Sequence, residues 1–453
     1  MTTSIAISNV GDRGRRLSID FLERIFPAHR SFAIRLWDGT ALPADGPSSF
    51  TLVLNSRGAL RRMFRPPLDM VVGESYVRGD FDIDGDLVDA VAALSSVASP
   101  RRVSQLADLA RLWFVLPTDR HRTDEVGFAP AELRAAVRSR EWEMSAIQYH
   151  YDLGNEFYEL FLGRQMVYTA AYFSDRSQSL DVAQEQKLDH VCRKLRLRPG
   201  ERLLDIGCGW GALLIHAATH YGVRGVGVTL SEQQHDLATR RIRAAGLGDR
   251  VEVRVQDYRD LDEPPFDKVA GIGIFEHVGR AGLAEYFGQA YRMLEPGGLF
   301  INHGIAVRMP PSDATGIGHS LRSALRNAVL GSTGFRRKYL WPNGDLVPLS
   351  VATTVAEQTG FQVCDVENLR PHYVLTLGHW RRNMDAARDE ALRIGGEAMY
   401  RLWRLFLAFA EHQFRSGAQT VNQVVMLKQA PDGAHPLPLT RDDLARTAPA
   451  RSS

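Results

Sequence analysis

Residues 202–211 read RLLDIGCGWG, and ALLIHAATHYG follows at 212–222. An apolar strand thus runs into a Gly-x-Gly-x-Gly turn, after which a helix begins. Glycines in such a turn let the backbone pass close beneath a ligand, which the free N–H groups of the helix N-terminus then face. The spacing is not the Gly-x-Gly-x-x-Gly of a dinucleotide loop, and no Walker lysine follows. Asp205, just before the turn, suits a cationic or hydroxylated ligand rather than a diphosphate, and a turn that serves packing alone is the alternative.

Four further apolar runs extend this pattern toward the C-terminus: GVGVTL (225–230), VEVRV (251–255), KVAGIGI (268–274) and LFINHGI (299–305). They alternate with helical stretches, which predicts a parallel α/β sheet. Polar side chains follow two of these strands. Ser231, Gln233 and Gln234 stand where a doubly wound sheet places a ribose-binding group. Asp257 and Tyr258 suit the edge and the face of an adenine ring.

The five motifs in this order resemble those of the class I S-adenosylmethionine (SAM) methyltransferases. A Rossmann-like domain for another nucleotide is disfavoured, because the glycine loop lacks phosphate-binding features. We therefore expect an α/β fold with a Rossmann-like, mostly parallel sheet and a helical lid, and a smaller N-terminal α+β domain. The expected segments are a flexible N-terminus (1–20), the N-terminal domain (21–116), a linker (117–130), the methyltransferase domain (131–430) and a disordered tail (431–453).

Composition and charge exclude several classes of protein. The 453 residues carry a formal net charge of only +2, which argues against a dedicated nucleic-acid binder. Cys192, Cys208 and Cys364 lie far apart without a CxxC pair, which excludes a disulfide framework and a thiolate metal site. No apolar run approaches the roughly 20 residues that span a bilayer, and the N-terminus lacks the apolar segment of a signal peptide. These features predict a soluble, cytoplasmic protein.

A second group of motifs narrows the resemblance: QYHYDLGNEFY (148–158), MVYTAAYF (166–173), FEHVG (275–279), YLWPNGDL (339–346) and RPHYVLTLGHW (370–380). Together they resemble the signature of the cyclopropane-fatty-acyl-phospholipid synthases, which the mycolic acid cyclopropane synthases and methyltransferases share. The resemblance covers about residues 140–428. Residues 73–87, GESYVRGDFDIDGDL, resemble the N-terminal domain of the long, phospholipid-acting members.

This resemblance implies a set of cofactor-binding residues. Tyr168 and Thr169 would contact the methionine part of SAM, and so would the loop 203–211. Residues 229–234 would bind the ribose, and Asp257 and Tyr258 would flank the adenine. The implied residues are Tyr168, Thr169, Leu203, Asp205, Gly207, Cys208, Gly209, Trp210, Gly211, Thr229, Leu230, Ser231, Gln233, Gln234, Asp257 and Tyr258.

The resemblance also implies a base. Members of the family hold a bicarbonate ion near the reacting methyl group, through residues that match Glu276, His303, the backbone of Ile305 and Tyr373. A cysteine that usually completes this shell is replaced by Ala170. Taken singly, Glu276 or His303 would be interpreted as a structural side chain, and His277 keeps that interpretation.

A second cysteine of many members corresponds to Ala410, which excludes a covalent thiol mechanism. If bicarbonate is absent, Glu141 and Glu143 are candidate internal bases, although solvated acids at a helix end are the commoner explanation. The sequence does not decide between these two sources of the base.

The chemistry of an unactivated cis alkene agrees with these residues. The π bond attacks the sulfonium methyl group and leaves a carbocation, which needs a dry cavity with aromatic walls and one base. Tyr168, Tyr172, Phe173 and Tyr373 are the expected wall residues. Proton loss from the added methyl group closes a cyclopropane, whereas a prior hydride shift gives a methylene- or methyl-branched chain.

The favoured function is cyclopropane formation on unsaturated phospholipid acyl chains. The alternatives are methyl transfer without ring closure, a small-molecule O- or N-methyltransferase, and a silent lipid-binding relative. The expected partners are unsaturated phospholipid acyl chains and, transiently, the inner face of the membrane. A homo-oligomer stays an open alternative.

Three other segments each allow a functional and a structural interpretation. DFDIDGD (80–86) imitates a calcium loop, but Val91 occupies the twelfth position, where a bidentate Glu is required. We therefore expect a charged turn and no metal. The amphipathic stretches 101–116 and 321–330 suit either core-facing helices or contact with an anionic bilayer. Packing is favoured for 101–116, and neither interpretation is favoured for 321–330.

Overall fold

The computed structural model describes residues 2–26, 29–65, 68–97, 111, 113–119, 140–151, 153–309, 334–342 and 344–445. The chain divides into two compact units, each built from several segments. Unit 1 comprises Met1–Ala131, Pro310–Leu340 and Arg388–His412. Unit 2 comprises Glu132–Met309, Trp341–Ala387 and Gln413–Ser453. Two segments within the continuous domain expected over 131–430 therefore belong to unit 1.

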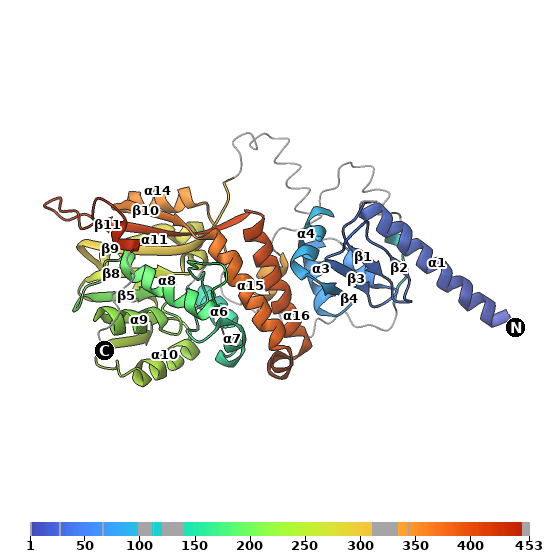
Figure 1. The fold of residues 1–453 in the computed structure, drawn as a ribbon, viewed down its shortest axis with the longest axis horizontal. Coiled ribbons are helices and arrows are strands. Elements are labelled where there is room, and N and C mark those ends of the chain that lie inside the picture. The colour runs from blue at the N-terminus through green and yellow to red at the C-terminus, as the bar shows by residue number, and fades with distance from the viewer. Residues whose placement is uncertain are drawn as a thin grey trace. The chain divides into compact units, whose positions relative to one another are not determined.

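Unit 2 contains a seven-stranded sheet with the order β10-β11-β9-β8-β5-β6-β7 (Figure 1). The strands are β5 (Arg202–Ile206), β6 (Arg224–Thr229), β7 (Val251–Val255), β8 (Phe266–Ile272), β9 (Leu294–Val307), β10 (Phe361–Asn368) and β11 (Gln419–Lys428). The pairs from β9 to β7 are parallel, which confirms the predicted mostly parallel α/β sheet. β10 and β11 add antiparallel pairs at one edge.

Helices cover both faces of this sheet. Successive residues of a strand point to opposite faces, so neighbouring strand residues pack against different helices. On β5, Leu203 joins a buried cluster with residues of α8, α9 and α10, whereas Leu204 joins another with residues of α11 and α14. Buried apolar side chains on both faces explain why these strands are almost continuously apolar in sequence. The helices are α8 (Leu180–Lys194), α9 (Ala212–Tyr221), α10 (Glu232–Ala244), α11 (Phe275–Arg292) and α14 (Leu349–Thr359).

The remaining helices of unit 2 are α6 (Arg140–Tyr151), α7 (Asn155–Leu162), α15 (Arg370–Ala386) and α17 (Asp442–Ala445). A 3-10 turn, η1, spans Tyr258–Asp260. Residues 431–445 were expected to be disordered. Instead Arg193 on α8 donates to the carbonyl of Leu444, and Arg196 pairs with Asp443 at 3.1 Å, so these contacts hold α17 against unit 2.

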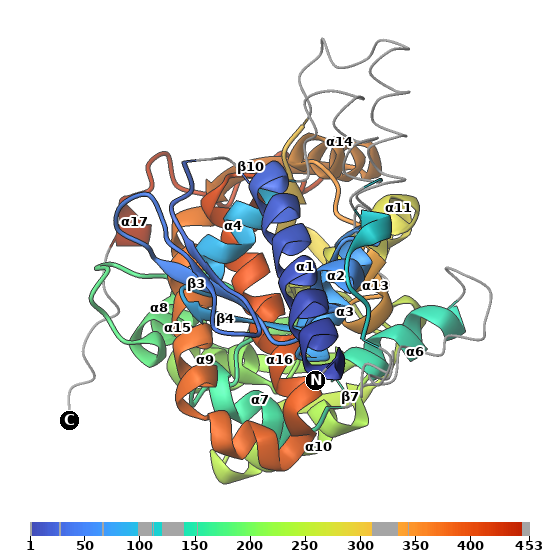
Figure 2. The ribbon, with the colours of Figure 1, turned by 90° about the vertical axis from the view of Figure 1, so that its right-hand side faces the viewer.

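Unit 1 is built around a four-stranded sheet with the order β2-β1-β3-β4. Its elements are α1 (Thr2–Ile25), β1 (Ala33–Arg35), β2 (Ala41–Leu42), β3 (Phe50–Leu54), α2 (Ala59–Met63), α3 (Leu68–Val77), β4 (Phe81–Gly85), α4 (Leu87–Val97), α13 (Gly334–Tyr339) and most of α16 (Arg388–Arg415). α1 runs beside the strands of this sheet (Figure 2), and its residues Phe21 and Leu22 belong to the same buried cluster as the strands. α1 is therefore a helix where a flexible N-terminus was expected over 1–20.

Within residues 80–86, Phe81–Gly85 form strand β4 rather than the expected charged turn. β4 pairs antiparallel with β3, and its aspartates serve as ion-pair partners. Asp80 lies 2.9 Å from Arg62, and Asp82 pairs with Arg401 of α16. Arg401 also donates to the carbonyl of Phe81, so these charges join α16 to the sheet.

The stretch 101–116 is described only at its end. Trp113 is half-buried and donates to the carbonyl of Arg61 at 2.9 Å, whereas Phe114 is 67% exposed. The stretch 321–330 and most of the expected linker lie outside the described residues. Within the described ranges, no helix is both long and apolar enough to span a bilayer.

Candidate active site

A cavity lies at the carboxyl ends of the parallel strands of unit 2, where open α/β sheets bind their ligands. It brings together twelve of the sequence-predicted cofactor residues: Tyr168, Thr169, Asp205, Gly207, Cys208, Gly209, Trp210, Thr229, Leu230, Gln234, Asp257 and Tyr258. Glu143, Ile147 and Tyr151 also line it. These three recur every four residues along α6, so one face of this helix covers the cavity as the expected lid would.

The glycine loop forms the floor of the cavity. Gly207 and Gly209 adopt positive φ angles of 73° and 53°, which L side chains rarely adopt. A Cβ on Gly207 would lie 1.9 Å from Cδ1 of Ile274, whereas a Cβ on Gly209 would meet no protein atom within 4 Å. Gly207 is thus required by the packing of Ile274, while Gly209 faces open space.

Four predicted cofactor residues are not among the lining residues. Leu203 is buried in the core, and Gly211 precedes α9 with φ 77°. Ser231 caps α10 by accepting from the N–H of Gln234. The carbonyl of Gln233 accepts from Nδ2 of Asn155 at 3.1 Å. These residues shape the loops rather than the cavity surface.

Asn155 explains why the HYDLGN segment accompanies the glycine loop. Its Oδ1 accepts from Nε1 of Trp210 at 2.7 Å, while its Nδ2 donates to Gln233. One amide side chain therefore links the loop after β5 to the loop after β6. Arg241 supports the same arrangement by donating to the carbonyls of Trp210 and Gln165 at 2.9 and 3.0 Å.

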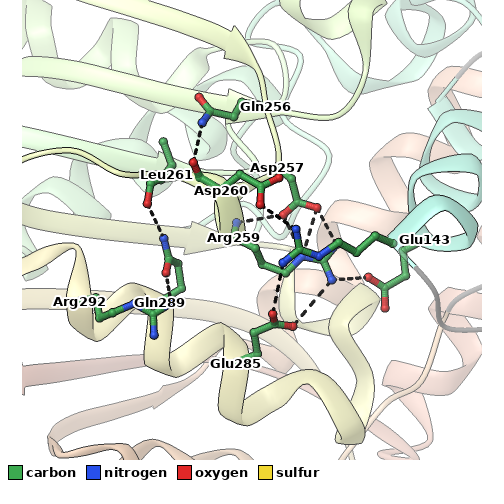
Figure 3. Close-up of polar contacts among 10 residues, drawn as sticks. Glu143, Gln256, Asp257, Arg259, Asp260, Leu261, Glu285, Gln289 and Arg292 are labelled. Atoms are coloured by element: carbon green, nitrogen blue, oxygen red, sulfur yellow. Dashed lines mark hydrogen bonds and ion pairs between the residues drawn. The ribbon is translucent and has the colours of Figure 1, made fainter.

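Three carboxylates surround one guanidinium at the expected adenine end of the cavity (Figure 3). Arg259 lies 2.6 Å from Asp257, 2.9 Å from Glu143 and 3.8 Å from Glu285. Although burial opposes the shift, hydrogen bonds from Arg259 hold the pKa of Asp257 below its ordinary value. Glu143 is thus committed to an ion pair. Glu141, on the same turn of α6, is exposed.

The segment MVYTAAYF is held by α15. The N–H of Ala171 donates to Oγ1 of Thr376, and the N–H of Phe173 donates to Nδ1 of His372, both at 3.0 Å. The RPHYVLTLGHW motif therefore positions the backbone of residues 171–173. The ring of Tyr172 stacks on His372 at 4.7 Å.

An aromatic cluster lies beside the cavity. The Tyr168 ring centroid is 5.3 Å from that of Trp380, 5.5 Å from Tyr158 and 6.4 Å from Tyr151. Tyr373 lies 5.9 Å from Trp380. Of the four expected wall residues, Tyr168 and Tyr373 belong to this cluster, whereas Tyr172 and Phe173 stack on histidines outside it.

Glu276 is the carboxylate of the expected base site. It is 3% exposed at the start of α11, and its Oε1 accepts from the N–H of Ile305 at 2.7 Å. Oε2 is buried and has no hydrogen-bond partner among the described residues. Burial raises the pKa of Glu276 to about 7, against hydrogen bonds from its own N–H and from Ile305. The Ile305 N–H, expected to hold an ion, is thus bound to Glu276.

His303 and Tyr373 are the other predicted side chains of the base site, and like Glu276 they are not among the residues that line the cavity. His303 lies on β9 opposite Ile272 of β8, and its buried Nδ1 lies 3.2 Å from Nε2 of Gln423. Nε2 has no partner among the described residues. Burial, followed by the charge of Glu276, raises the pKa of Tyr373.

The other predicted residues have structural surroundings. His277 accepts from Nε1 of Trp341 at 3.0 Å, and the N–H of Asp345 donates to the carbonyl of Glu276. The YLWPNGDL motif thus supports the start of α11. Ala170 is fully buried. Sequence reasoning missed Tyr151, Arg259 and Lys187 on the cavity wall. Tyr151 and Lys187 lie on helices away from the strand ends, whereas Arg259 directly follows the predicted pair Asp257 and Tyr258.

The fold and the cavity define the class: the chain has the architecture of a SAM-dependent methyltransferase. Residues 138–424 match the family model described as mycolic acid cyclopropane synthetase. The chain therefore belongs to this family and is a SAM-dependent methyltransferase of it.

Individual relatives agree with this assignment. The chain is 35% identical to "Probable fatty acid methyltransferase" of Pseudomonas putida, over 92% of this chain and 97% of the relative. It is 33% identical to a protein of the same description from Mycobacterium tuberculosis, over 94% and 98%. Among solved structures, the mycolic acid cyclopropane synthase CmaA1 complexed with SAH and CTAB is 31% identical. Its TM-score is 0.57, over 62% of this chain and 97% of that one.

Proposed function

We propose that the protein transfers the methyl group of SAM to the cis double bond of an unsaturated acyl chain in a membrane phospholipid, with closure of a cyclopropane ring. The observation that carries this proposal is a cavity lined by the predicted cofactor residues together with buried acid–base groups at the predicted base residues. Glu276 and His303 each have a buried polar atom without a hydrogen-bond partner among the described residues, and Tyr373 belongs to the aromatic cluster. Chemistry at a carbocation needs this combination of ring faces and a proton acceptor.

The cavity residues fit SAM. Oγ1 of Thr169 and Oδ1 of Asp205 are buried polar atoms without protein hydrogen bonds among the described residues, and both residues line the cavity. Gly209 leaves open space above the floor. Asp257 and Tyr258 would flank the adenine, with Arg259 holding the Asp257 carboxylate in place. When bound, SAM supplies the electrophilic methyl group.

The protein's own residues then govern the carbocation and its proton. In the proposed reaction, the alkene carbon forms the new C–C bond while the S–CH3 bond breaks. Tyr168 and Tyr373 present ring faces to the positive charge. Removal of one proton from the added methyl group, with C–C bond formation, closes the ring.

The base site fits a bicarbonate ion in part. A proton on Nε2 of His303 and the hydroxyl of Tyr373 would be donors that could hold the ion, and a protonated Glu276 would add a third. Two features reduce the fit: Ile305 N–H already donates to Glu276, and Ala170 offers no thiol. These two features support the second candidate function, methyl transfer that ends in a methylene-branched chain.

Access to lipid is proposed through unit 1. Phe114 and Val115 are 67% and 50% exposed, and Arg111 and Arg65 are exposed as well. Apolar side chains with nearby arginines suit the surface of an anionic bilayer. The proposed location is therefore cytoplasmic, peripherally on the inner face of the membrane.

The deciding experiment is lipid mass spectrometry of bacterial cells that express the protein, with methyl-labelled methionine in the medium. Labelled cyclopropane chains in the phospholipids are the expected result. Labelled methylene chains would establish the second candidate. Cells that express Glu276→Gln serve as the control, and equal labelling in both would contradict the proposal.

A further inference from the structure

One buried lysine on the cavity wall has no role in the proposed methyl transfer. Lys187 lies on α8, is 2% exposed and lines the cavity. Among the described residues, no side chain forms an ion pair or hydrogen bond with its ammonium group. A buried ammonium group without an anion is costly, so its place at a ligand cavity calls for an explanation.

Lys194, two turns along α8, shows how the fold treats a buried lysine that serves structure. It is 1% exposed, and its Nζ lies 2.6 Å from Glu367 and 3.5 Å from Asp365. Lys187 lacks such contacts although the two side chains are equally buried. The difference is that Lys187 reaches the cavity.

Asp205 lines the same cavity as Lys187 with the opposite charge, and it is also incompletely satisfied among the described residues. It ends β5 just before the glycine loop, lines the same cavity, and has an unpartnered Oδ1. Burial lowers the pKa of Lys187 to about 8, and Asp205 opposes this shift. Burial raises the pKa of Asp205 to about 7, and Lys187 opposes it. The two groups influence each other without forming an ion pair, so both remain available to a ligand.

A ligand that carries one cation and one anion a few ångströms apart would satisfy both groups. The amino-acid end of SAM has this pattern, with an α-ammonium and an α-carboxylate on one carbon. We propose that Lys187 binds the α-carboxylate of SAM, while Asp205 accepts from the α-ammonium. This inference rests on the proposed function, because it assigns a residue to the cofactor named there.

The contact concerns a part of SAM that does not react. Its energy is thus the same in the ground state and the transition state, and it lowers KM without raising kcat. Loss of one member of a buried charge pair typically costs 2–5 kcal/mol, which is about 30-fold or more in affinity.

The test compares two ligands by calorimetry: SAH, and the SAH analogue in which hydrogen replaces the α-carboxylate. The wild-type protein is expected to bind SAH about 30-fold more tightly than the analogue. In Lys187→Met this ratio should fall to about 3-fold or less, with affinity for the analogue unchanged. Lys187→Arg should restore most of the ratio. In turnover assays, Lys187→Met should raise KM for SAM far more than it lowers kcat.

The matched control is Lys194→Met, which removes a lysine equally buried on the same helix and should leave the ligand ratio as in wild type. Equal ratios in wild type and Lys187→Met would overturn the inference while leaving SAM binding intact. A wild-type protein that binds both ligands equally would overturn it as well, whether or not Lys187→Met folds. A wild-type protein that binds neither ligand would overturn the proposed cofactor itself.

Discussion

The cofactor cavity and the base site each contain one buried carboxylate, and the two are surrounded differently. Asp205 shares its cavity with the lysine on α8, whereas Glu276 accepts backbone N–H groups. Burial raises the pKa of each to about 7. A carboxylate beside a cation suits the recognition of a zwitterion. A carboxylate without one can exchange a proton near neutral pH. Similar burial thus serves binding in one region and proton chemistry in the other.

The largest effect is expected from substitutions that disrupt the cofactor cavity and leave the base site unchanged. Gly207→Val should abolish SAH binding by calorimetry, because its Cβ would collide with Ile274 and displace it in the cavity wall. Gly209→Val should abolish it too, since its side chain would fill the open space above the loop. Gly246→Val is the control: Gly246 also has a positive φ, of 68°, with no atom near its would-be Cβ, and does not line the cavity. Unchanged SAH affinity in Gly207→Val would refute this placement of the cofactor.

The next largest effect is expected from substitutions that disrupt the base site and leave the cofactor cavity unchanged. Glu276→Gln should lower turnover by about 100-fold or more, the range of a lost general acid–base group, while SAH affinity stays within about 2-fold. Tyr373→Phe should show the same separation with a smaller loss. The measurement pairs methyl transfer to lipid vesicles with calorimetry of SAH. Wild-type turnover in both variants would show that the reaction uses another base.

A third expectation concerns the stability of the ligand-free protein. The pKa of Glu276 is about 7 in the folded chain, against about 4.3 when unfolded. As pH rises from about 4 to 7, the unfolded chain releases this proton before the folded one does, so stability falls across that window and then levels off. Glu276→Gln lacks this loss and should be more stable than wild type by about 3–4 kcal/mol at pH 8. Chemical denaturation at pH 5 and pH 8 measures it, and a gain that is equal at both pH values would contradict the assigned pKa.

Much of the cofactor cavity could be predicted from the sequence, because it is built from strand ends. Asp205 and Tyr258 follow apolar runs directly, and parallel strands bring their carboxyl ends to one edge. Residues such as Asn155 and Lys187 were not predicted as site residues. They lie on helices before the sheet begins, and their approach to the strand ends depends on tertiary packing that no local pattern encodes.

The errors of prediction have the same origin. Residues 80–86 looked like a turn because aspartates are rare in strands, yet Arg62 and Arg401 neutralise Asp80 and Asp82 from distant segments. Residues 388–412 join unit 1 although they follow the methyltransferase motifs in sequence. Long-range ion pairs and chain crossings of this kind are set by the whole fold.

The smallest effect is expected at Ala170, and it concerns how firmly the base site holds bicarbonate. This fully buried position offers no polar atom to an ion in the base site. If bicarbonate is the base, turnover in degassed buffer should rise when bicarbonate is added. Ala170→Cys should then lower the bicarbonate concentration for half-maximal activity by a few-fold, about the worth of one weak hydrogen bond. It should also raise the cyclopropane share, because a better-held base removes the proton before a hydride can shift.

The alternative to bicarbonate is a carboxylate of the protein that acts as the base. Glu143 is paired with Arg259, and Glu141 is exposed, so Glu141→Gln and Glu143→Gln should both retain turnover. Product ratios by mass spectrometry, with and without bicarbonate, test all three variants against wild type. If turnover did not depend on bicarbonate, and if Glu141→Gln or Glu143→Gln abolished turnover, an internal base would be established and the methylene product favoured. If turnover ignored bicarbonate and only Glu276→Gln lost it, Glu276 itself would be the base, as its unpaired oxygen and raised pKa allow.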